Sequence, residues 1–232
     1  MKNFTFKALA LCLSGVVLLS CEQAEESEVN PISVTQSKNF GTDPTSCEII
    51  EFDAATPVTY DKGAAATVYS ENTPVRIMGQ YRKNKGDYHK QNRALMFNTT
   101  NPDANNAAFK TPSPAAIRPM GDVLTLGKAK GDVNELYTKG GRIELDFSAM
   151  GSIELKGIHV LDITADEADS KIELIGKKNK VIKTMALPVT GAYGATRLRI
   201  DTPGVVKLRV VFGPNSTRTG GGAIDVIEFC RE

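Results

Sequence analysis

An alternation of apolar and polar residues runs through most of the chain from residue 47 onward. In the segment 142–147, Arg-Ile-Glu-Leu-Asp-Phe, the apolar residues fall on one face of an extended strand and the charged residues on the other. Segments 171–174, 197–201 and 206–212 repeat this pattern, which is typical of half-buried β-strands. Apolar residues at helical spacing never continue for more than about a turn and a half, so we expect no substantial helix.

Turn-forming residues separate these segments at intervals of roughly 8–12 residues, the spacing typical of a β-sandwich or barrel. Segment 158–163 is apolar on both faces apart from His159 and Asp162. It therefore predicts an interior strand, with His159 packed in the core and Gly157 marking a β-bulge. These patterns together predict an all-β fold, an antiparallel β-sandwich of jelly-roll type.

The N-terminus has the features of an export signal. Residues 1–20 begin with Lys2 and Lys7 and continue into an apolar stretch that is too short for a stable transmembrane helix. The following Leu-Leu-Ser-Cys at 18–21 resembles the bacterial lipobox, whose cysteine is lipidated and becomes the mature N-terminus. We therefore predict a lipid on Cys21, because several buried acyl chains at about 0.8 kcal/mol per CH₂ anchor a protein stably. The alternative is an ordinary signal peptide with an incidental cysteine.

Residues 21–46 are predicted to be the lipidated cysteine and a flexible acidic linker, followed by one β-sandwich domain at 47–232. The linker is rich in polar residues, and Glu22-Gln-Ala-Glu-Glu26 follows Cys21 directly. This cluster resembles the acidic export signal of surface-exposed lipoproteins of Bacteroidota, although a solvated tether needs a similar composition. We expect a protein lipid-anchored to the bacterial outer membrane, with exposure at the cell surface left open.

Two of the four cysteines lie at the ends of the predicted domain. Cys47 opens the first strand-like segment and Cys230 closes the last one, at 223–230. If these strands pair antiparallel with the cysteines opposite each other, Ile50 falls opposite Ile227 and the apolar side chains share one face. Because export places the domain in an oxidising compartment, we predict a Cys47–Cys230 disulfide and adjacent terminal strands. Two free thiols are the alternative.

Charge is balanced over the whole chain but concentrated locally. The 28 basic and 27 acidic residues give no general field for nucleic acid, which we exclude as a partner. Segment 81–93 combines cations, tyrosines and amides, and its polarity predicts an exposed loop. The candidate ligand-binding residues in it are Tyr81, Arg82, Lys83, Lys85, Tyr88, His89, Lys90 and Arg93. They suit an anionic glycan, a sulfated polymer or a phosphate-rich surface, and the alternative is an ordinary charged loop.

A resemblance to known domains rests on a series of short segments. They are Ala-Leu-Met-Phe-Asn at 94–98, Gly-Asp-Val-Leu-Thr-Leu at 121–126, Gly-Gly-Arg-Ile-Glu-Leu-Asp-Phe at 140–147, Val-Leu-Asp-Ile at 160–163 and Gly-Ala-Ile-Asp-Val-Ile-Glu-Phe at 222–229. In this order they resemble a diffuse group of secreted bacterial β-sandwich domains. The last one also resembles the closing strand of carbohydrate-binding modules with a galactose-binding-like jelly roll. The resemblance implies the fold and a glycan ligand, while the absence of tryptophan removes the best surface for stacking sugars.

The same resemblance implies a structural calcium ion where the first and last strands meet. The matching residues are Glu51, Asp53 and Asp225. Calcium takes six to eight oxygen ligands, so backbone carbonyls would complete the shell. Strict alternation places Asp53 and Asp225 on opposite faces unless the strand end bends. The alternative is that these acids are solvated or cap turns.

Catalytic motifs are absent from the sequence. Of the two histidines, neither His89 nor His159 neighbours a nucleophile elbow or a His-Glu-x-x-His motif. We therefore predict a non-catalytic binding domain on a lipid-anchored envelope protein, with glycan as the leading ligand. The alternatives are a structural or adhesive surface lipoprotein that contacts other proteins, and a glycan hydrolase.

Overall fold

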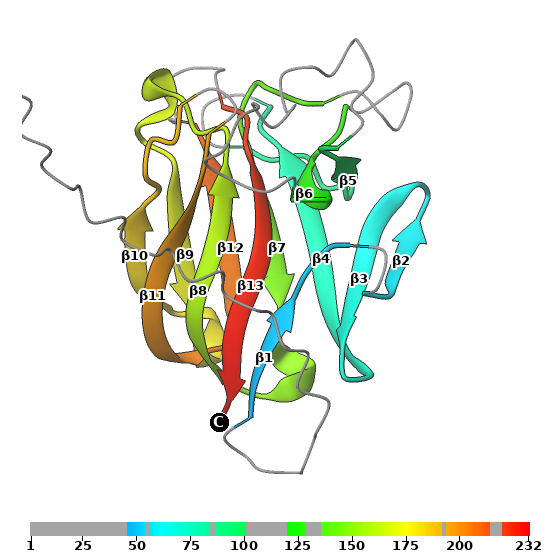
Figure 1. The fold of residues 1–232 in the computed structure, drawn as a ribbon, viewed down its shortest axis with the longest axis vertical. Helices are drawn as coiled ribbons and strands as arrows, with labels where there is room; N and C mark the ends of the chain where they lie inside the picture. The colour runs from blue at the N-terminus through cyan, green and yellow to red at the C-terminus, as the bar shows by residue number, and fades with distance from the viewer. Residues whose placement is uncertain are drawn as a thin grey trace, which may run out of the picture. The chain divides into compact units, whose positions relative to one another are not determined.

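The computed structural model describes residues 46–53, 56–83, 87–100, 120–128, 136–191, 194–213 and 220–232. The predicted signal, the lipidation site Cys21 and nearly all of the predicted linker lie outside these residues. The described residues form two antiparallel β-sheets that face each other, with only short 3₁₀ turns between strands (Figure 1). The predicted all-β sandwich is confirmed. No helix among the described residues is long and apolar enough to cross a membrane.

Two sheets make up the described part of the chain. The first has the order β11-β8-β13-β6-β5, with β1 also paired to β13, and the second has the order β10-β9-β12-β7-β4-β3-β2. The strands of the first sheet are β1 (Cys47–Ile50), β5 (Ala94–Asn98), β6 (Asp122–Leu126), β8 (Ile153–Leu161), β11 (Ala195–Val205) and β13 (Ala223–Arg231). Those of the second are β2 (Val58–Asp61), β3 (Ala64–Ser70), β4 (Thr73–Tyr81), β7 (Gly141–Asp146), β9 (Lys171–Ile175), β10 (Val181–Ala186) and β12 (Lys207–Phe212). The 3₁₀ turns are η2 (Ser148–Met150), η3 (Ala165–Glu167) and η4 (Lys177–Asn179).

The core lies between the two sheets and follows the alternation of the sequence. In β7, Ile143 and Leu145 are fully buried, whereas the charged residues between them are partly exposed on the outer face. Phe147 and Phe229 meet in the core with ring centroids 5.5 Å apart. His159 corrects one expectation, because it is half-buried on β8 rather than packed in the core.

The first and last strands pair as predicted. β1 runs antiparallel to β13 with Cys47 opposite Cys230 and Ile50 opposite Ile227, and a disulfide joins the two cysteines. Ile50, Ile227 and Phe229 are fully buried, so the apolar side chains share the core face. The register of β13 against β8 shifts at Glu228, which stands opposite Gly157, so the predicted bulge is present in the partner strand of Gly157.

The sandwich of residues 46–232 has two distinct ends. The chain enters β1 at Cys47 at the end of the sandwich that also carries the turns at 71–72 and 176–180, and we call this the entry end. The opposite end, at the top of Figure 1, carries the β2–β3 turn at 62–63, segment 82–93 and Gly213, and we call it the loop end. The two ends present different chemistry.

Candidate functional site

At the loop end, strand β4 changes its neighbour halfway along. β3 pairs with β4 only as far as Thr67 opposite Arg76, after which the two strands separate. Segment 88–93 then takes the place of β3. His89 N donates to Tyr81 O over 3.0 Å, and Arg93 N donates to Gly79 O over 2.7 Å. A fork therefore forms between β3 and the upper half of β4.

Asn92 fills the base of this fork. Its Oδ1 accepts hydrogen bonds from Gly79 N at 2.8 Å and Ala94 N at 3.1 Å. Its Nδ2 donates to Ala65 O on β3 at 2.7 Å and to Ile77 O on β4 at 3.2 Å. These four bonds use the whole hydrogen-bonding capacity of the amide. Gly79 lets the chain cross here, because a Cβ on it would lie 2.4 Å from Ala94 N.

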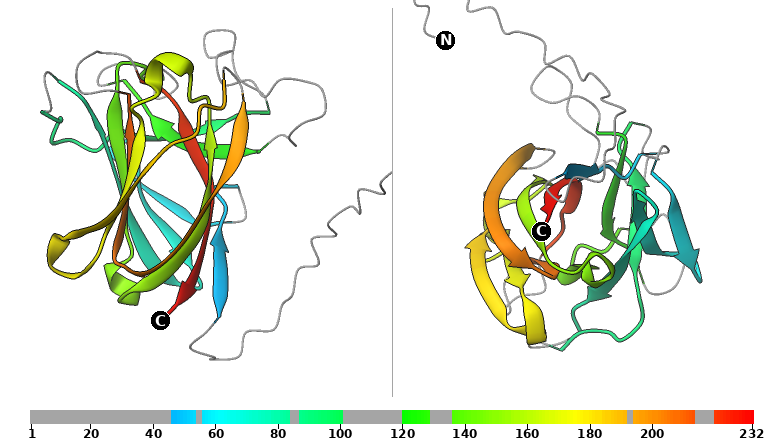
Figure 2. Two further views of the ribbon diagram at one scale, coloured as in Figure 1. Left: turned by 90° about the vertical axis from the view of Figure 1, so that its left-hand side faces the viewer. Right: turned by 90° about the horizontal axis from the view of Figure 1, so that it is seen from below.

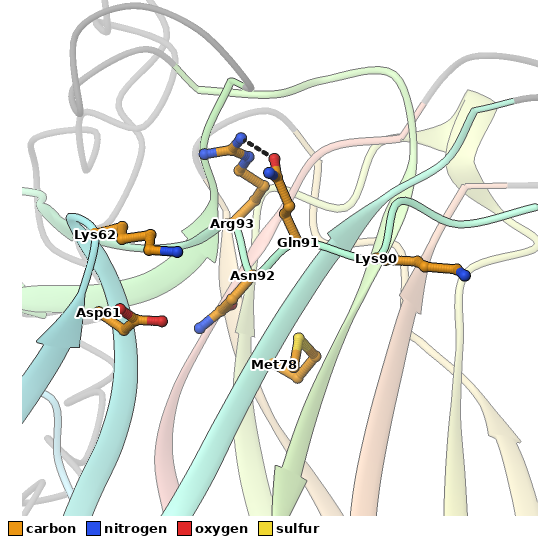
Figure 3. Close-up of a pocket in the computed structure, with 7 residues that line it drawn as sticks. All are labelled: Asp61, Lys62, Met78, Lys90, Gln91, Asn92 and Arg93. Atoms are coloured by element: carbon orange, nitrogen blue, oxygen red, sulfur yellow. Dashed lines mark hydrogen bonds between the residues drawn. The ribbon is translucent and has the colours of Figure 1, made fainter.

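The fork opens outward into a cavity of about 340 Å³ (Figure 3). Asp61 and Lys62 line it from the β2–β3 turn, Met78 from β4, and residues 90–93 from the opposite side. Met78 is 40% exposed and provides an apolar surface. The volume is within the range of about 300–1,000 Å³ common for small-ligand sites.

The cavity is lined by more cations than anions. Lys62, Lys90 and Arg93 contribute three positive charges and Asp61 one negative charge. The guanidinium of Arg93 is oriented by a hydrogen bond from Nη2 to Gln91 Oε1 at 2.6 Å (Figure 3). Its Nε is buried and has no hydrogen-bond partner in the described part of the chain. This arrangement suits a ligand that carries a carboxylate, sulfate or phosphate group.

Aromatic rings accompany the cations along segment 81–93. The ring centroid of Tyr81 lies 4.4 Å from that of His89 and 5.0 Å from that of Tyr137. Tyr88 packs over the guanidinium of Arg142, whose Cζ is 4.2 Å from the ring centroid, a cation–π contact. Desolvation and the nearby charges of Lys83 and Arg93 lower the pKa of His89, so its imidazole is neutral near pH 7.

The expectation of an exposed loop is wrong for Arg82. This side chain is 2% exposed, and its Nη2 donates to Phe212 O at 3.3 Å and Gly213 O at 3.1 Å. The guanidinium fits because Gly140 has no side chain, since a Cβ there would lie 2.8 Å from Arg82 Nη1. Arg82 therefore ties the end of β4 to the end of β12 and does not face the cavity.

The other predicted ligand-binding residues have different positions. Lys90 and Arg93 line the cavity, whereas Tyr81, Tyr88 and His89 are half-buried beside it. Lys83 is exposed, and Lys85 lies outside the described residues.

The three predicted calcium ligands lie near one another, and two of them, Asp53 and Asp225, accept hydrogen bonds from backbone amides. The end of β13 does bend, because Val226 has a φ of 45° where the register shifts between Asp225 and Glu228. Asp225 is buried and its Oδ1 accepts from Phe52 N at 3.5 Å, while Asp53 Oδ1 accepts from Asp122 N at 2.9 Å.

Burial raises the pKa of Asp225 to about 7, and the charges of Asp53 and Glu51 add to the effect. In the described ranges, no group of three or more histidine, cysteine or acidic side chains is arranged to hold a metal ion. Calcium binding therefore stays a prediction of the sequence, which melting temperatures with calcium and with chelator test directly.

Several cavity residues were missed by the sequence analysis. Asp61 and Lys62 precede Gly63 in an evident turn, but nothing in the sequence joins this turn to residues 90–93. Met78 follows the strand alternation, which gives it an outward position but no cavity.

Comparison with known proteins gives the following similarities. Neither a protein-family model nor a curated protein matches the chain. Among solved structures, the carbohydrate-binding module TmCBM61 in complex with β-1,4-galactotriose is 15% identical, with 71% of this chain and 98% of that chain covered and a TM-score of 0.35. A Streptococcus pneumoniae fucose binding module is 12% identical, with 45% and 70% covered and a TM-score of 0.31. The enzymatically active domain of bacteriophage CBA120 tailspike protein 4 is 14% identical, with 67% and 19% covered and a TM-score of 0.30. These similarities are too low to carry a function to this chain.

Proposed function

We propose that this chain is a lipid-anchored envelope protein whose sandwich domain binds an anionic glycan without catalysis. The observation that carries the proposal is the cavity at the loop end, which Lys62, Lys90 and Arg93 line together with the exposed Met78. The remaining parts of the proposal come from the sequence. The signal at 1–20 and the lipobox cysteine Cys21 support export and anchoring to an outer membrane.

An acidic sugar has the chemistry that this cavity suits. Its carboxylate or sulfate group pairs with the three cations, and charged hydrogen bonds of this kind are stronger than neutral ones. Its apolar ring face packs on the Met78 side chain. Its hydroxyls hydrogen-bond to Asp61 and to the amide of Gln91. The amide of Asn92 already makes all its hydrogen bonds to the backbone, so Asn92 only forms part of the cavity wall.

A glycan array tests the proposal with the unlipidated chain 22–232, which keeps every described residue. We expect binding to glycans with uronic acids or sulfate groups and weaker binding to their neutral counterparts. The triple variant Lys62→Gln, Lys90→Gln and Arg93→Gln should lose at least about tenfold in affinity, since each charged contact contributes roughly 1 kcal/mol. The matched control is Lys177→Gln, Lys178→Gln and Lys180→Gln, which removes the same charge at the entry end.

Three results would contradict this proposal. Unchanged binding by the cavity variant would place the ligand elsewhere. Binding to proteins but to no glycan would favour an adhesive role. Release of reducing ends from a polysaccharide panel would show a hydrolase.

A further inference from the structure

The hairpin between β9 and β10 carries a second basic surface, at the entry end. All six residues of the segment 177–182, which we call the hairpin tip, are exposed to solvent. Lys177, Lys178 and Lys180 lie beside Val181 and Ile182, which are 44% and 43% exposed. Exposed branched aliphatic residues next to unpaired lysines form a surface with both apolar and cationic character.

The hairpin tip has a defined conformation. Lys178 and Asn179 both have positive φ values, 60° and 56°, as in the type I′ turn that suits the twist of a hairpin. Gly176 N donates to Lys180 O at 2.9 Å and closes the turn. Lys183 fixes the neighbouring edge, because its Nζ donates to Ile200 O and to Thr202 Oγ1, each at 3.0 Å.

The three lysines of the tip differ from Arg209 and Lys207 on the same sheet. Arg209 lies between Glu144 and Glu173 at 2.8 Å and 3.0 Å, and Lys207 is 3.2 Å from Asp146. Within the described residues, no ion pair or hydrogen bond involves the side chains of the three tip lysines, so their charge faces solvent.

Among the described residues, the acidic side chains of the entry end have partners other than the hairpin tip. Glu48 and Glu71 pair with Arg231, and Asp201 pairs with Arg199. Glu232 accepts a hydrogen bond from Gly204 N at 2.9 Å. The positive charge of the tip is therefore available to an external anion.

The position of the tip in the sandwich indicates which anion. β9 runs toward the entry end, so the tip lies at the end where the chain enters at Cys47 (Figures 1 and 2). The chain between the lipobox Cys21 and Cys47 is 25 residues long. If it is the flexible linker that the sequence predicts, it spans about 28 Å on average, which keeps the entry end within reach of a bilayer that holds the lipid.

We propose that the hairpin tip binds the surface of an anionic lipid bilayer, with its lysines at the headgroups and Val181 and Ile182 at the edge of the acyl region. This orientation rests on the proposed lipid anchor, but the affinity of the tip for lipid does not. It leaves the loop end and its cavity pointing away from the membrane. Basic and apolar residues together are the combination that favours interfacial binding.

Vesicle co-sedimentation of the unlipidated chain 22–232 tests this proposal. We expect binding to vesicles of equal parts phosphatidylglycerol and phosphatidylcholine, and little binding to phosphatidylcholine alone. Each lysine near an anionic surface changes the partition coefficient about fivefold. The variant Lys177→Gln, Lys178→Gln and Lys180→Gln should therefore bind roughly a hundredfold more weakly. The variant Val181→Ser and Ile182→Ser should lose the binding that persists at high salt.

The cavity variant Lys62→Gln, Lys90→Gln and Arg93→Gln is the matched control, because it removes the same charge from the loop end. It should bind vesicles like the unaltered protein and lose only glycan affinity, so the two proposals fail independently.

Equal binding of the hairpin variant and the unaltered protein would overturn the lipid contact. So would equal binding to both kinds of vesicle, or the absence of vesicle binding. Complete loss of vesicle binding in the presence of a soluble anionic polysaccharide, with tight binding of that polymer to the tip, would assign the tip to a polymer instead. Circular dichroism of each variant checks that the sandwich is intact.

Discussion

The cavity at the loop end and the hairpin tip at the entry end each present three cations. They differ in shape and in how far hydrogen bonds fix the surrounding structure. The cavity cations surround a concave space whose base is fixed by the four hydrogen bonds of Asn92. The tip lysines project from a convex turn with no partner among the described residues. A concave site selects a ligand by shape and by charge together, whereas a convex tip responds to the charge of an extended surface.

The outer face of the second sheet shows a third use of charge. There Arg209 lies between Glu144 and Glu173, so its charge is neutralised by ion pairs within the protein. The number of cations therefore does not locate a binding surface. The shape of the surface and the ion pairing of its cations locate it.

The largest expected effect concerns the entry end. The double variant Cys47→Ser and Cys230→Ser should lose about 5 kcal/mol of unfolding free energy in the chain-entropy limit, because the disulfide closes a loop of 183 residues. Urea denaturation with and without reductant measures this loss. Hydrogen exchange should rise first in β1 and last in segment 88–93. Equal acceleration at both ends would show that the ends unfold as one unit.

Asp225 lies between the two ends, where β1 stops along the edge of β13. Its pKa is raised from an ordinary 3.8 to about 7 in the fold, so its protonated form is favoured there. The stability that the protonated Asp225 carboxyl contributes is therefore fully present below about pH 4 and is lost as the pH rises through 7. Asp225→Asn should remove this dependence and stabilise the protein at pH 8 by on the order of 3 kcal/mol.

Urea titrations at pH 5 and pH 8 measure the effect of Asp225. Asp201→Asn is the control, because Arg199 lowers the pKa of that exposed carboxyl and gives a weak dependence of opposite sign. A variant Asp225→Asn that is less stable than the unaltered protein at pH 8 would contradict the prediction. A rise in melting temperature with calcium that this variant abolishes would support the calcium site instead.

At the loop end, Asn92→Ala should destabilise the protein by about 2–3 kcal/mol. The substitution leaves Gly79 N, Ala65 O and other backbone groups of the fork without their partners, and unsatisfied groups of this kind are costly. Glycan binding should fall with stability, whereas vesicle binding through the hairpin tip should persist. Gln91→Ala is the control for stability, since the Gln91 side chain bonds only to Arg93 within the described residues. Chemical denaturation and both binding assays give the comparison.

The smallest expected effect is a gain at the hairpin tip. Asn179→Gly should stabilise the protein by about 0.5 kcal/mol, because glycine adopts the left-handed conformation without strain in a type I′ turn. All three lysines are retained, so vesicle binding should not change. A loss of stability in thermal unfolding would show that the Asn179 side chain has a role that the turn geometry does not require.

The sequence by itself determined the layers of this protein and the contact between its ends. Alternation at 142–147 and 206–212 assigned strands and their buried faces, because the side chains of an extended strand point to opposite sides. The same rule, with two cysteines at matching positions, predicted the register of Cys47 against Cys230. Composition marked a basic segment at 81–93, and two of its predicted ligand-binding residues, Lys90 and Arg93, line the cavity.

Only the tertiary structure decided which cationic side chains are accessible to an external ligand. Lys62 and Arg93 line the same cavity because β3 leaves β4 after Arg76, and strand separation has no signature in local periodicity. Arg82 is buried because carbonyls of Phe212 and Gly213, 130 residues away, accept its hydrogen bonds. Lys207 is half-buried and has Asp146 opposite it on the neighbouring strand, whereas the lysines of the hairpin tip are exposed and have no such carboxylate among the described residues. Pairing of this kind depends on which strands become neighbours, and that depends on contacts between residues far apart in the chain.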